Sequence, residues 1–397
     1  MTPPPSPVEH VQALVVGAGP VGLFATLCAA RRGLRALLLD QGFRDYAPGH
    51  ATLLHGSTLQ LLREIGLAKE LEAKGRSISR IAICVDGASV TNLSLPSPAL
   101  AVPQSVLERV LLEALRAEGA DLRPAHQAAT IEQHDDYAEV RVIRQERATR
   151  DEPHQSEWQP VESSLIRADY VIGADGYESR VRSALSIEAV DVGPSESFAM
   201  FEAEAPGDTW SDTEEIGIFD ELGSVVLPLA GGRRRWAFQI NKQLDQPPDI
   251  GRLRALITER LQRQDYGVDR IDWGTVIQFE RRMARRFGRR RAWLAGDAAH
   301  VTSPLGGQSM NVGLSEARDL VNRVTDSIRD RNGVHLERYA AEREREWHKL
   351  FGLNVQFDLL PHAPRWLAAH ARRIVPALPA SGTQLTDLLS QLGLRLS

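Results

Sequence analysis

Continuous apolar runs mark the most buried strands that this sequence predicts. They cover residues 11–16, 34–39, 168–173 and 291–295. Short runs without polar alternation are typical of strands buried on both faces of a parallel sheet. A helical pattern over residues 21–32 lies between the first two runs. This order of strand, turn, helix and strand within about 30 residues is how a nucleotide-binding parallel sheet begins.

Leucines at three- and four-residue spacing predict helices over residues 57–65 and 104–118. Further helices are expected near residues 250–264 and over residues 307–328. The C-terminal residues 346–397 are amphipathic with proline breaks, which predicts a helical region there.

A second group of segments favours shorter, less buried strands, and a mostly antiparallel sheet inserted into the nucleotide-binding domain is expected from it. These segments are residues 78–85, 90–95, 224–229, 235–240 and 276–279. Residues 144–164 form a polar insertion rich in Glu, Gln and Arg, for which we expect an exposed hairpin or loop.

Composition narrows the functional classes. The 397 residues carry a formal charge of −5, which does not favour nucleic-acid binding. No apolar run approaches the roughly 18 residues of a membrane span, and the N-terminus lacks the features of a secretory signal. The two cysteines and eleven histidines show no metal-ligand spacing, so no metal site is expected. A cytoplasmic protein fits these features best.

The first motif is a glycine-rich turn, Gly17-Ala18-Gly19-Pro20-Val21-Gly22, between the first strand and the first helix. Glycines in this pattern allow a tight turn, close approach of the backbone to a pyrophosphate, and close packing of helix on sheet. Asp40 ends the second strand, where a carboxylate can accept hydrogen bonds from ribose hydroxyls. The motif alone predicts a dinucleotide site but does not separate FAD from NAD.

Two later motifs follow buried strands. Residues 173–176 read Gly-Ala-Asp-Gly, with Asp175 as the acidic residue. Residues 296–297 read Gly-Asp, and a glycine-containing loop from Pro304 to Asn311 then leads into a long helix. A carboxylate at a strand end is a suitable acceptor for the hydroxyls of a ribityl chain. Asp175 also suits a helix N-cap, and both roles can hold together.

With these three motifs in order, the chain resembles the flavin monooxygenases of the p-hydroxybenzoate hydroxylase family. The resemblance implies an α/β fold, with a doubly wound, Rossmann-like FAD domain, an inserted substrate sheet and a helical C-terminus. It implies FAD as cofactor, Asp297 against the ribityl chain, and Asp175 beside FAD and NAD(P)H. The FAD-binding domain is expected in residues 1–75, 101–185 and 281–345, the substrate domain in 76–100 and 186–280, and the helical region in 346–397. The predicted cofactor-binding residues are Gly17, Gly19, Pro20, Gly22, Asp40, Gln41, Arg44, Gln104, Asp175, Gly296, Asp297, Pro304, Gly306, Gly307, Gln308, Ser309, Met310 and Asn311.

The sequence departs from this family at three places. Ser309 stands where the last glycine of the loop is commonest, and Glu316 stands where the family often has aspartate. His50 occupies the position of a family arginine near the flavin, a role that Arg44 could take instead. An arginine run over residues 281–291 suits either a solvated connection or the phosphates of NADPH, and the former is preferred. His300 could face the flavin or close the turn after Asp297.

The resemblance implies a reaction as well as a fold. It implies an NAD(P)H-consuming monooxygenase that hydroxylates an aromatic or similarly electron-rich small molecule with molecular oxygen, through a flavin C4a-hydroperoxide. No catalytic residue is identified. Another flavin reaction on the same fold, by a halogenase or a prenyl reductase, stays open, and so does a flavin-binding module without turnover. The choice between NADH and NADPH, the substrate and the oligomeric state stay open too.

Overall fold

The computed structural model describes residues 8–42, 51–85, 88–147, 158–205, 215–219, 223–241, 249–261, 268, 270–353, 357–364 and 366–396. Arg44 and His50, the two candidates for the family arginine, lie outside the described residues.

The first sheet carries the glycine-rich turn. Its central strands run parallel and are apolar on both faces, as the continuous runs predicted. In the described residues it comprises β1 (Glu9–Val16), β2 (Ala36–Asp40), β6 (Asp121–Pro124), β7 (His126–Gln133), β8 (Ala138–Arg147), β9 (Trp158–Gly173), β15 (Gly288–Arg289) and β16 (Ala292–Leu294). In the part of the polar insertion that the structure describes, an exposed antiparallel pair is found, since β8 pairs with Trp158–Ala168 of β9.

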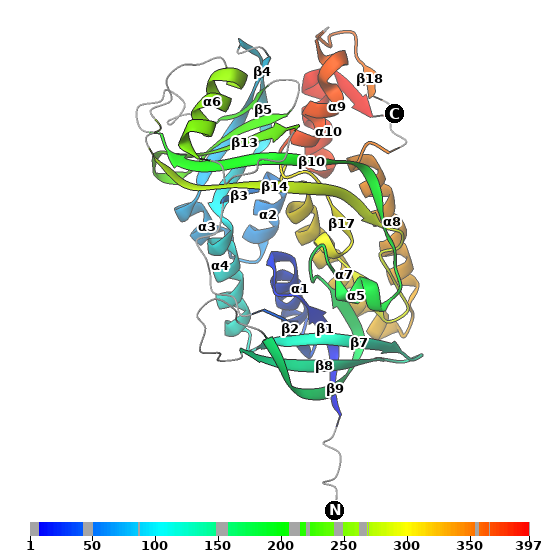
Figure 1. The fold of residues 1–397 in the computed structure, drawn as a ribbon. Coiled ribbons are helices and arrows are strands. Elements are labelled where there is room, and N and C mark those ends of the chain that lie inside the picture. Colours follow the sequence, from blue (N-terminus) through cyan, green and yellow to red (C-terminus); the bar gives the residue numbers. More distant parts are fainter. Residues whose placement is uncertain are drawn as a thin grey trace, which may run out of the picture.

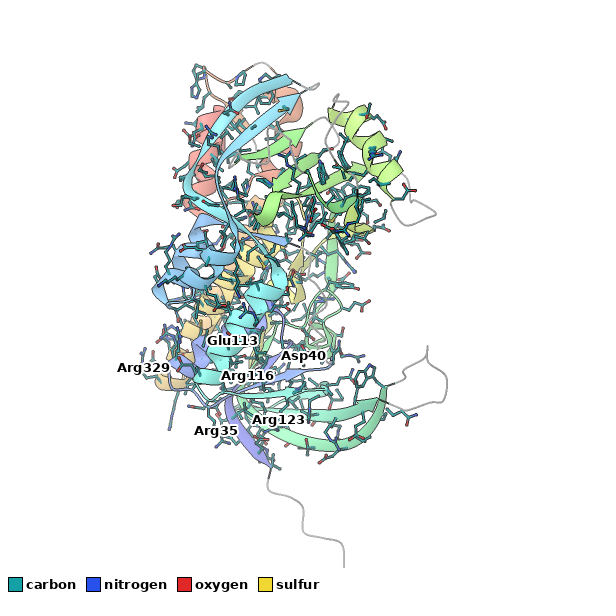
Figure 2. All side chains as sticks on the ribbon, turned by 90° about the vertical axis from the view of Figure 1, so that its left-hand side faces the viewer. Arg35, Asp40, Glu113, Arg116, Arg123 and Arg329 are labelled. Carbon is teal, nitrogen blue, oxygen red and sulfur yellow. The ribbon has the colours of Figure 1, made fainter. Side chains whose placement is uncertain are left out.

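The register of this sheet brings four chain segments to one edge. Val16 at the end of β1 pairs with Leu39 of β2 and with Gly173 of β9, and Gly173 pairs with Leu294 of β16. The segments that follow these strands contain all three motifs of the sequence. In Figure 2, Arg35 and Asp40 stand at opposite ends of β2, with Asp40 nearer the second sheet. The motif-bearing edge therefore faces the second sheet.

Helices cover the first sheet and extend from it toward the second sheet. α1 contacts both α4 and α7, and α8 packs along α7. The helices of this part are α1 (Pro20–Arg31), α2 (Gly56–Glu64), α3 (Ala68–Lys74), α4 (Gln104–Ala117), α5 (Arg180–Ala184), α7 (Gln308–Asp330) and α8 (Val334–Leu350), with a short 3-10 turn at Gly296–Ala298. The helices predicted over residues 21–32, 57–65, 104–118 and 307–328 are confirmed as α1, α2, α4 and α7, whereas α3 was not predicted.

The second sheet lies across the motif-bearing edge (Figure 1). Its neighbours pair antiparallel, except β4 and β11, which pair parallel. This confirms the mostly antiparallel second sheet. In the described residues its strands are β3 (Ala51–Leu54), β4 (Arg76–Val85), β5 (Ala88–Pro103), β10 (Ala189–Glu204), β11 (Glu215–Phe219), β12 (Ser224–Pro228), β13 (Arg233–Ile240), β14 (Ile271–Ala284) and β17 (His300–Val301). A 3-10 turn at Ala230–Gly232 joins β12 to β13, and α6 (Ile250–Leu261) packs on this sheet.

The C-terminal region packs against the second sheet, through an apolar cluster that includes Leu388 and Ile81. It contains α9 (Leu367–Ala377) and α10 (Gly382–Leu392), and α9 ends directly after Pro376, as a proline break predicts. The helical C-terminus is confirmed, and the region also contains β18 (Phe357–Leu359) and β19 (Leu394–Leu396), which pair as a small antiparallel sheet that was not predicted. Within the described residues, no helix is both long and apolar enough to cross a membrane.

Candidate functional site

The turn between β1 and α1 and the first turn of α1 each have one position with room only for glycine. Gly17 has a φ of +99°, and a Cβ atom there would lie 2.4 Å from the carbonyl oxygen of Ala174. A Cβ atom on Gly22 would lie 1.7 Å from the carbonyl oxygen of Gly17. α1 then begins at Pro20 with no side chain capping its first N–H groups. Because free N–H groups at a helix N-terminus bind phosphate well, the turn fits the predicted pyrophosphate.

Asp40 lies beside this turn and holds its backbone. Its Oδ2 accepts a hydrogen bond from the Ala18 N–H at 2.6 Å, and its Oδ1 accepts one from the Gly42 N–H at 2.8 Å. Each carboxylate oxygen has a further lone pair, so the side chain can also accept from a ribose hydroxyl.

A first cavity of about 360 Å³ opens at the glycine turn, and several of the predicted residues line it. Gln41 and Arg180 close one side, with Arg180 Nε 3.3 Å from Gln41 Oε1. The lining comprises Val16, Gly17, Gly19, Asp40, Gln41, Gly42, His126, Gln127, Ala128, Ala174, Asp175, Gly176 and Arg180. The size and the backbone donors suit the adenosine and pyrophosphate end of a dinucleotide.

Asp175 accepts hydrogen bonds at the start of α5, although the N-cap residue of that helix is Ser179 and not, as one of its two predicted uses had it, Asp175. Its Oδ2 accepts from the N–H groups of Arg180 and Val181, at 2.7 and 3.1 Å, and its Oδ1 accepts from the Ser179 hydroxyl at 2.5 Å. Burial raises the pKa of Asp175, and these hydrogen bonds oppose that rise. Asp175 thus fixes the start of α5 at the wall of the first cavity.

Asp297 lies in the 3-10 turn that follows β16. Its backbone is set by Gly296, which has a φ of +61°. The carboxylate opens into the cavities described next and accepts a hydrogen bond from the Ser309 hydroxyl. Asp297 is exposed to these cavities, and partial desolvation by the surrounding protein raises its pKa, while the Ser309 hydrogen bond opposes the rise. Serine at position 309 therefore adds a direct partner for Asp297 that a glycine there would lack.

A second cavity of about 310 Å³ extends from Asp297 beneath the second sheet. The start of α7 forms one wall, with Gly307 as the N-cap in the left-handed conformation. The strands supply a mostly apolar opposite wall. The lining comprises Ala51, Thr52, Leu53, Gln104, Met200, Val225, Leu227, Arg235, Ala237, Ile277, Phe279, Asp297, Val301, Thr302, Ser303, Pro304, Leu305, Gly307, Ser309 and Met310.

Three predicted residues of the loop face other protein segments instead of these cavities. Gln308 Nε2 donates to the carbonyl oxygens of Leu378 and Ala380, at 3.0 and 2.6 Å. Asn311 Nδ2 donates to the carbonyl oxygen of Leu53 at 2.7 Å. A Cβ atom on Gly306 would lie 2.4 Å from the carbonyl oxygen of Pro376. These residues hold the loop against β3 and the C-terminal region, and their direct contact with a cofactor stays a prediction.

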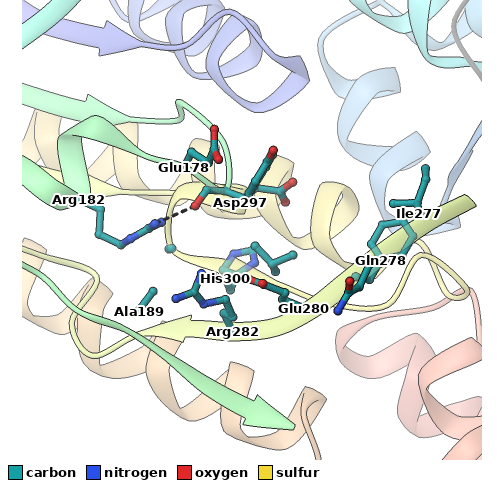
Figure 3. Close-up of a pocket in the computed structure, with 13 residues that line it drawn as sticks. Glu178, Arg182, Ala189, Ile277, Gln278, Glu280, Arg282, Asp297 and His300 are labelled. Carbon is teal, nitrogen blue, oxygen red and sulfur yellow. Dashed lines mark hydrogen bonds and ion pairs between the residues drawn. The ribbon is translucent and has the colours of Figure 1, made fainter. Parts of the chain in front are cut away.

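A third cavity, of about 520 Å³, shares Ile277, Phe279, Asp297 and Val301 with the second cavity. Figure 3 shows Arg182, Asp297 and His300 around it, with Glu280 and Arg282 of β14. Arg182 donates to the carbonyl oxygens of Ala298 and Tyr177 at 2.8 and 2.7 Å, and desolvation lowers its pKa. The full lining is Tyr177, Glu178, Arg182, Ala189, Ile277, Gln278, Phe279, Glu280, Arg282, Asp297, Ala299, His300 and Val301.

The arginine run is mostly a surface connection, in line with the preferred interpretation. Arg285 pairs with Glu188 at 2.6 Å and Arg290 with Asp135 at 2.5 Å, all four side chains being more than half exposed. Of the seven arginines, Arg282 lines the third cavity.

Arg235 was not predicted, although it lines the second cavity. Its guanidinium bonds Glu202 at 2.5 Å, and Glu202 also accepts from the Ala51 N–H at 2.8 Å. Arg235 is one of three consecutive arginines on β13, and alternation along a strand places every second side chain on one face. The run of arginines was visible in the sequence, but the sequence did not show which face of β13 meets the cavity.

Comparisons with known proteins agree with this geometry. The model of a protein family described as FAD binding domain matches residues 10–351. The chain is 26% identical over 351 residues to 6-methylpretetramide 4-monooxygenase of Streptomyces rimosus, covering 85% of this chain and 60% of that protein. It is 24% identical over 356 residues to rifampicin monooxygenase of Rhodococcus hoagii, covering 83% and 67%. The chain thus spans about 60% of the length of the first of these relatives.

Solved structures share the fold. p-Nitrophenol 4-monooxygenase PnpA from Pseudomonas putida DLL-E4 superposes with a TM-score of 0.73 at 20% identity, covering 97% of this chain and 94% of that one. The flavin-dependent monooxygenase PieE, solved with FAD and substrate, gives a TM-score of 0.67 at 23% identity, covering 82% and 59%.

Proposed function

We infer the function of this chain from one premise: it belongs to the FAD binding domain family. The residues fit that cofactor. Glycine is sterically required at Gly17 and Gly22, the N-terminus of α1 is uncapped, and Asp40 stands beside it. The first cavity would hold the adenosine and pyrophosphate of FAD, Asp297 the ribityl hydroxyls, and the second cavity the ring.

We propose that the chain is an NAD(P)H-consuming monooxygenase that hydroxylates an aromatic or similarly electron-rich small molecule. The observation that carries this proposal is the apolar strand wall of the second cavity, which lies opposite the start of α7, where we place the flavin ring. Met200, Val225, Leu227 and Phe279 line the cavity there, which suits a planar apolar substrate. When bound, FAD supplies the acceptance of hydride from NAD(P)H and the activation of molecular oxygen.

The side chains have positioning and exclusion roles in this proposal. The apolar strand wall keeps water from the reacting atoms. Arg235, ion-paired with Glu202, places guanidinium N–H groups at the wall of the same cavity, and these donors favour a substrate with a phenolate or another acceptor group. The third cavity, with Arg182 and Arg282, is the place we propose for the transient contact with NAD(P)H. We place this activity in the cytoplasm.

The test is an isotope experiment. FAD-loaded protein is incubated with NADPH or NADH, a panel of phenols and ¹⁸O₂, and the products are weighed by mass spectrometry. We expect substrate-stimulated oxidation of the nicotinamide and a product that carries one ¹⁸O atom. A product without ¹⁸O would indicate another flavin reaction. Absence of nicotinamide oxidation with every compound would indicate a binding module.

A separate prediction concerns the identity of the flavin. Because the glycine turn and Asp40 suit a pyrophosphate and an adenosine ribose, which FMN lacks, the purified protein is expected to be yellow and to release FAD. The measurement is chromatography of the flavin released by denaturation. Release of FMN would contradict the prediction, and so would failure to bind added FAD.

A further inference from the structure

Glu316 is a fully buried carboxylate on α7, and it receives three hydrogen bonds. Its Oε2 accepts from the Gly296 N–H at 3.0 Å and lies 2.7 Å from His300 Nε2. Its Oε1 accepts from Trp347 Nε1 at 2.6 Å. Burial alone would raise the pKa of Glu316, but His300, Trp347 and Gly296 together lower it below its ordinary value. The side chain is therefore a satisfied, ionised acceptor inside the protein.

The partners of Glu316 bracket Asp297. Gly296 directly precedes Asp297, and His300 follows it after two alanines. One carboxylate thus ties both ends of the turn that presents Asp297 to the cavities. Gly296 has a left-handed φ of +61°, so the direction of this turn depends on contacts that hold it there.

Trp347 connects this arrangement to α8. Its indole stacks on the His300 ring, with centroids 3.6 Å apart, and is itself fully buried. The longer glutamate side chain at position 316 reaches the indole N–H as well as the turn. His300 thus closes the turn, and its ring also borders the third cavity.

We propose that Glu316, with Trp347 and His300, is the positioning device for Asp297 and hence for the ribityl chain of FAD. The inference rests on FAD binding alone and does not depend on the proposed oxygenation. Its test therefore measures FAD affinity and not turnover, so that it can fail or succeed independently of the monooxygenase activity.

The first variants are Trp347→Phe and Glu316→Gln. Phenylalanine retains a ring against His300 but removes the donor to Glu316. Glutamine retains the shape but turns an NH₂ group toward at least one of three donors. Measured by fluorescence titration of apoprotein, the Kd of FAD is expected to rise about three- to ten-fold for Trp347→Phe and more than about ten-fold for Glu316→Gln.

The matched control is Trp236→Phe. Trp236 is equally buried, but it lies in the apolar cluster between the second sheet and α6. We expect it to lower the Tm of the apoprotein and leave the Kd of FAD unchanged. If Trp347→Phe and Trp236→Phe give the same Kd, Trp347 has only a packing role and the proposal is wrong.

A double variant tests whether Trp347 acts through Glu316. If it does, Trp347→Phe with Glu316→Gln has the FAD affinity of Glu316→Gln alone, because the ionised carboxylate through which Trp347 acts is already gone. If the two substitutions instead multiply each other's effect on the Kd of FAD, Trp347 does not act through Glu316, and this part of the proposal is wrong. Should Glu316→Gln fail to fold, the comparison of Trp347→Phe with Trp236→Phe still decides the proposal.

Discussion

Replacement of Asp297 by alanine is expected to raise the Kd of FAD about ten- to a hundred-fold. A hydrogen bond to a charged group contributes about 1.5–3 kcal/mol, and about 1.4 kcal/mol corresponds to a tenfold change in affinity. Asp297 opens into two cavities and follows the strand whose end lies beside the glycine turn. Within the protein, its carboxylate is held by Ser309, so it is oriented before a cofactor arrives.

Asp135→Ala is the control for this variant. Asp135 is almost fully exposed and pairs with Arg290, also on the surface, at 2.5 Å. Exposed ion pairs contribute about 0–1 kcal/mol to stability, so this change should leave both stability and the Kd of FAD nearly as they were. Fluorescence titration of the two apoproteins gives the comparison. Equal affinities would show that Asp297 does not hold the ribityl chain.

The position of Asp297 also shows which part of the site could be predicted from the sequence alone. The apolar runs before Gly17, Asp40, Asp175 and Asp297 are each recognisable as buried strands, and parallel pairing brings their ends to one edge. The local motif and the global register agree there, so the gathering of these residues at one edge of the sheet was predictable.

The lining of the second and third cavities was less predictable, because it depends on which face of a strand meets the first sheet. No role was predicted for Arg182 or Arg235, and their place in the cavities follows only from the packing of the two sheets. β3 is too short to leave a pattern. The sequence also did not show that the amides of Gln308 and Asn311 donate to carbonyl groups of the C-terminal region and of β3, which depends on how distant segments pack.

Gly307 gives the second large expected effect, and its backbone dictates how the experiment is designed. We place the N-terminus of α7 against the pyrimidine end of the flavin ring, where its dipole would stabilise the negative charge of reduced flavin by about 0.3–1 kcal/mol. A leucine here would fill cavity space needed by the ring. However, Gly307 has a φ of +63°, and a Cβ atom would lie 3.3 Å from the carbonyl oxygen of Leu53. Gly307→Leu is therefore strained by about 1–2 kcal/mol whether or not a flavin lies there.

Gly66→Leu separates backbone strain from displacement of the ring. Gly66 has a φ of +76° with no atom within 4 Å of an added Cβ, and it is not among the residues that line the three cavities. Both leucine variants should lose Tm, but only Gly307→Leu should slow flavin reduction by NAD(P)H and divert oxygen into hydrogen peroxide. Stopped-flow absorbance and a peroxide assay measure these quantities. Gly307→Asn, whose side chain tolerates the left-handed conformation, serves if the leucine variant does not fold. If a folded, FAD-bound Gly307 variant reduces flavin and forms peroxide at the rates of Gly66→Leu, the ring does not lie at the start of α7.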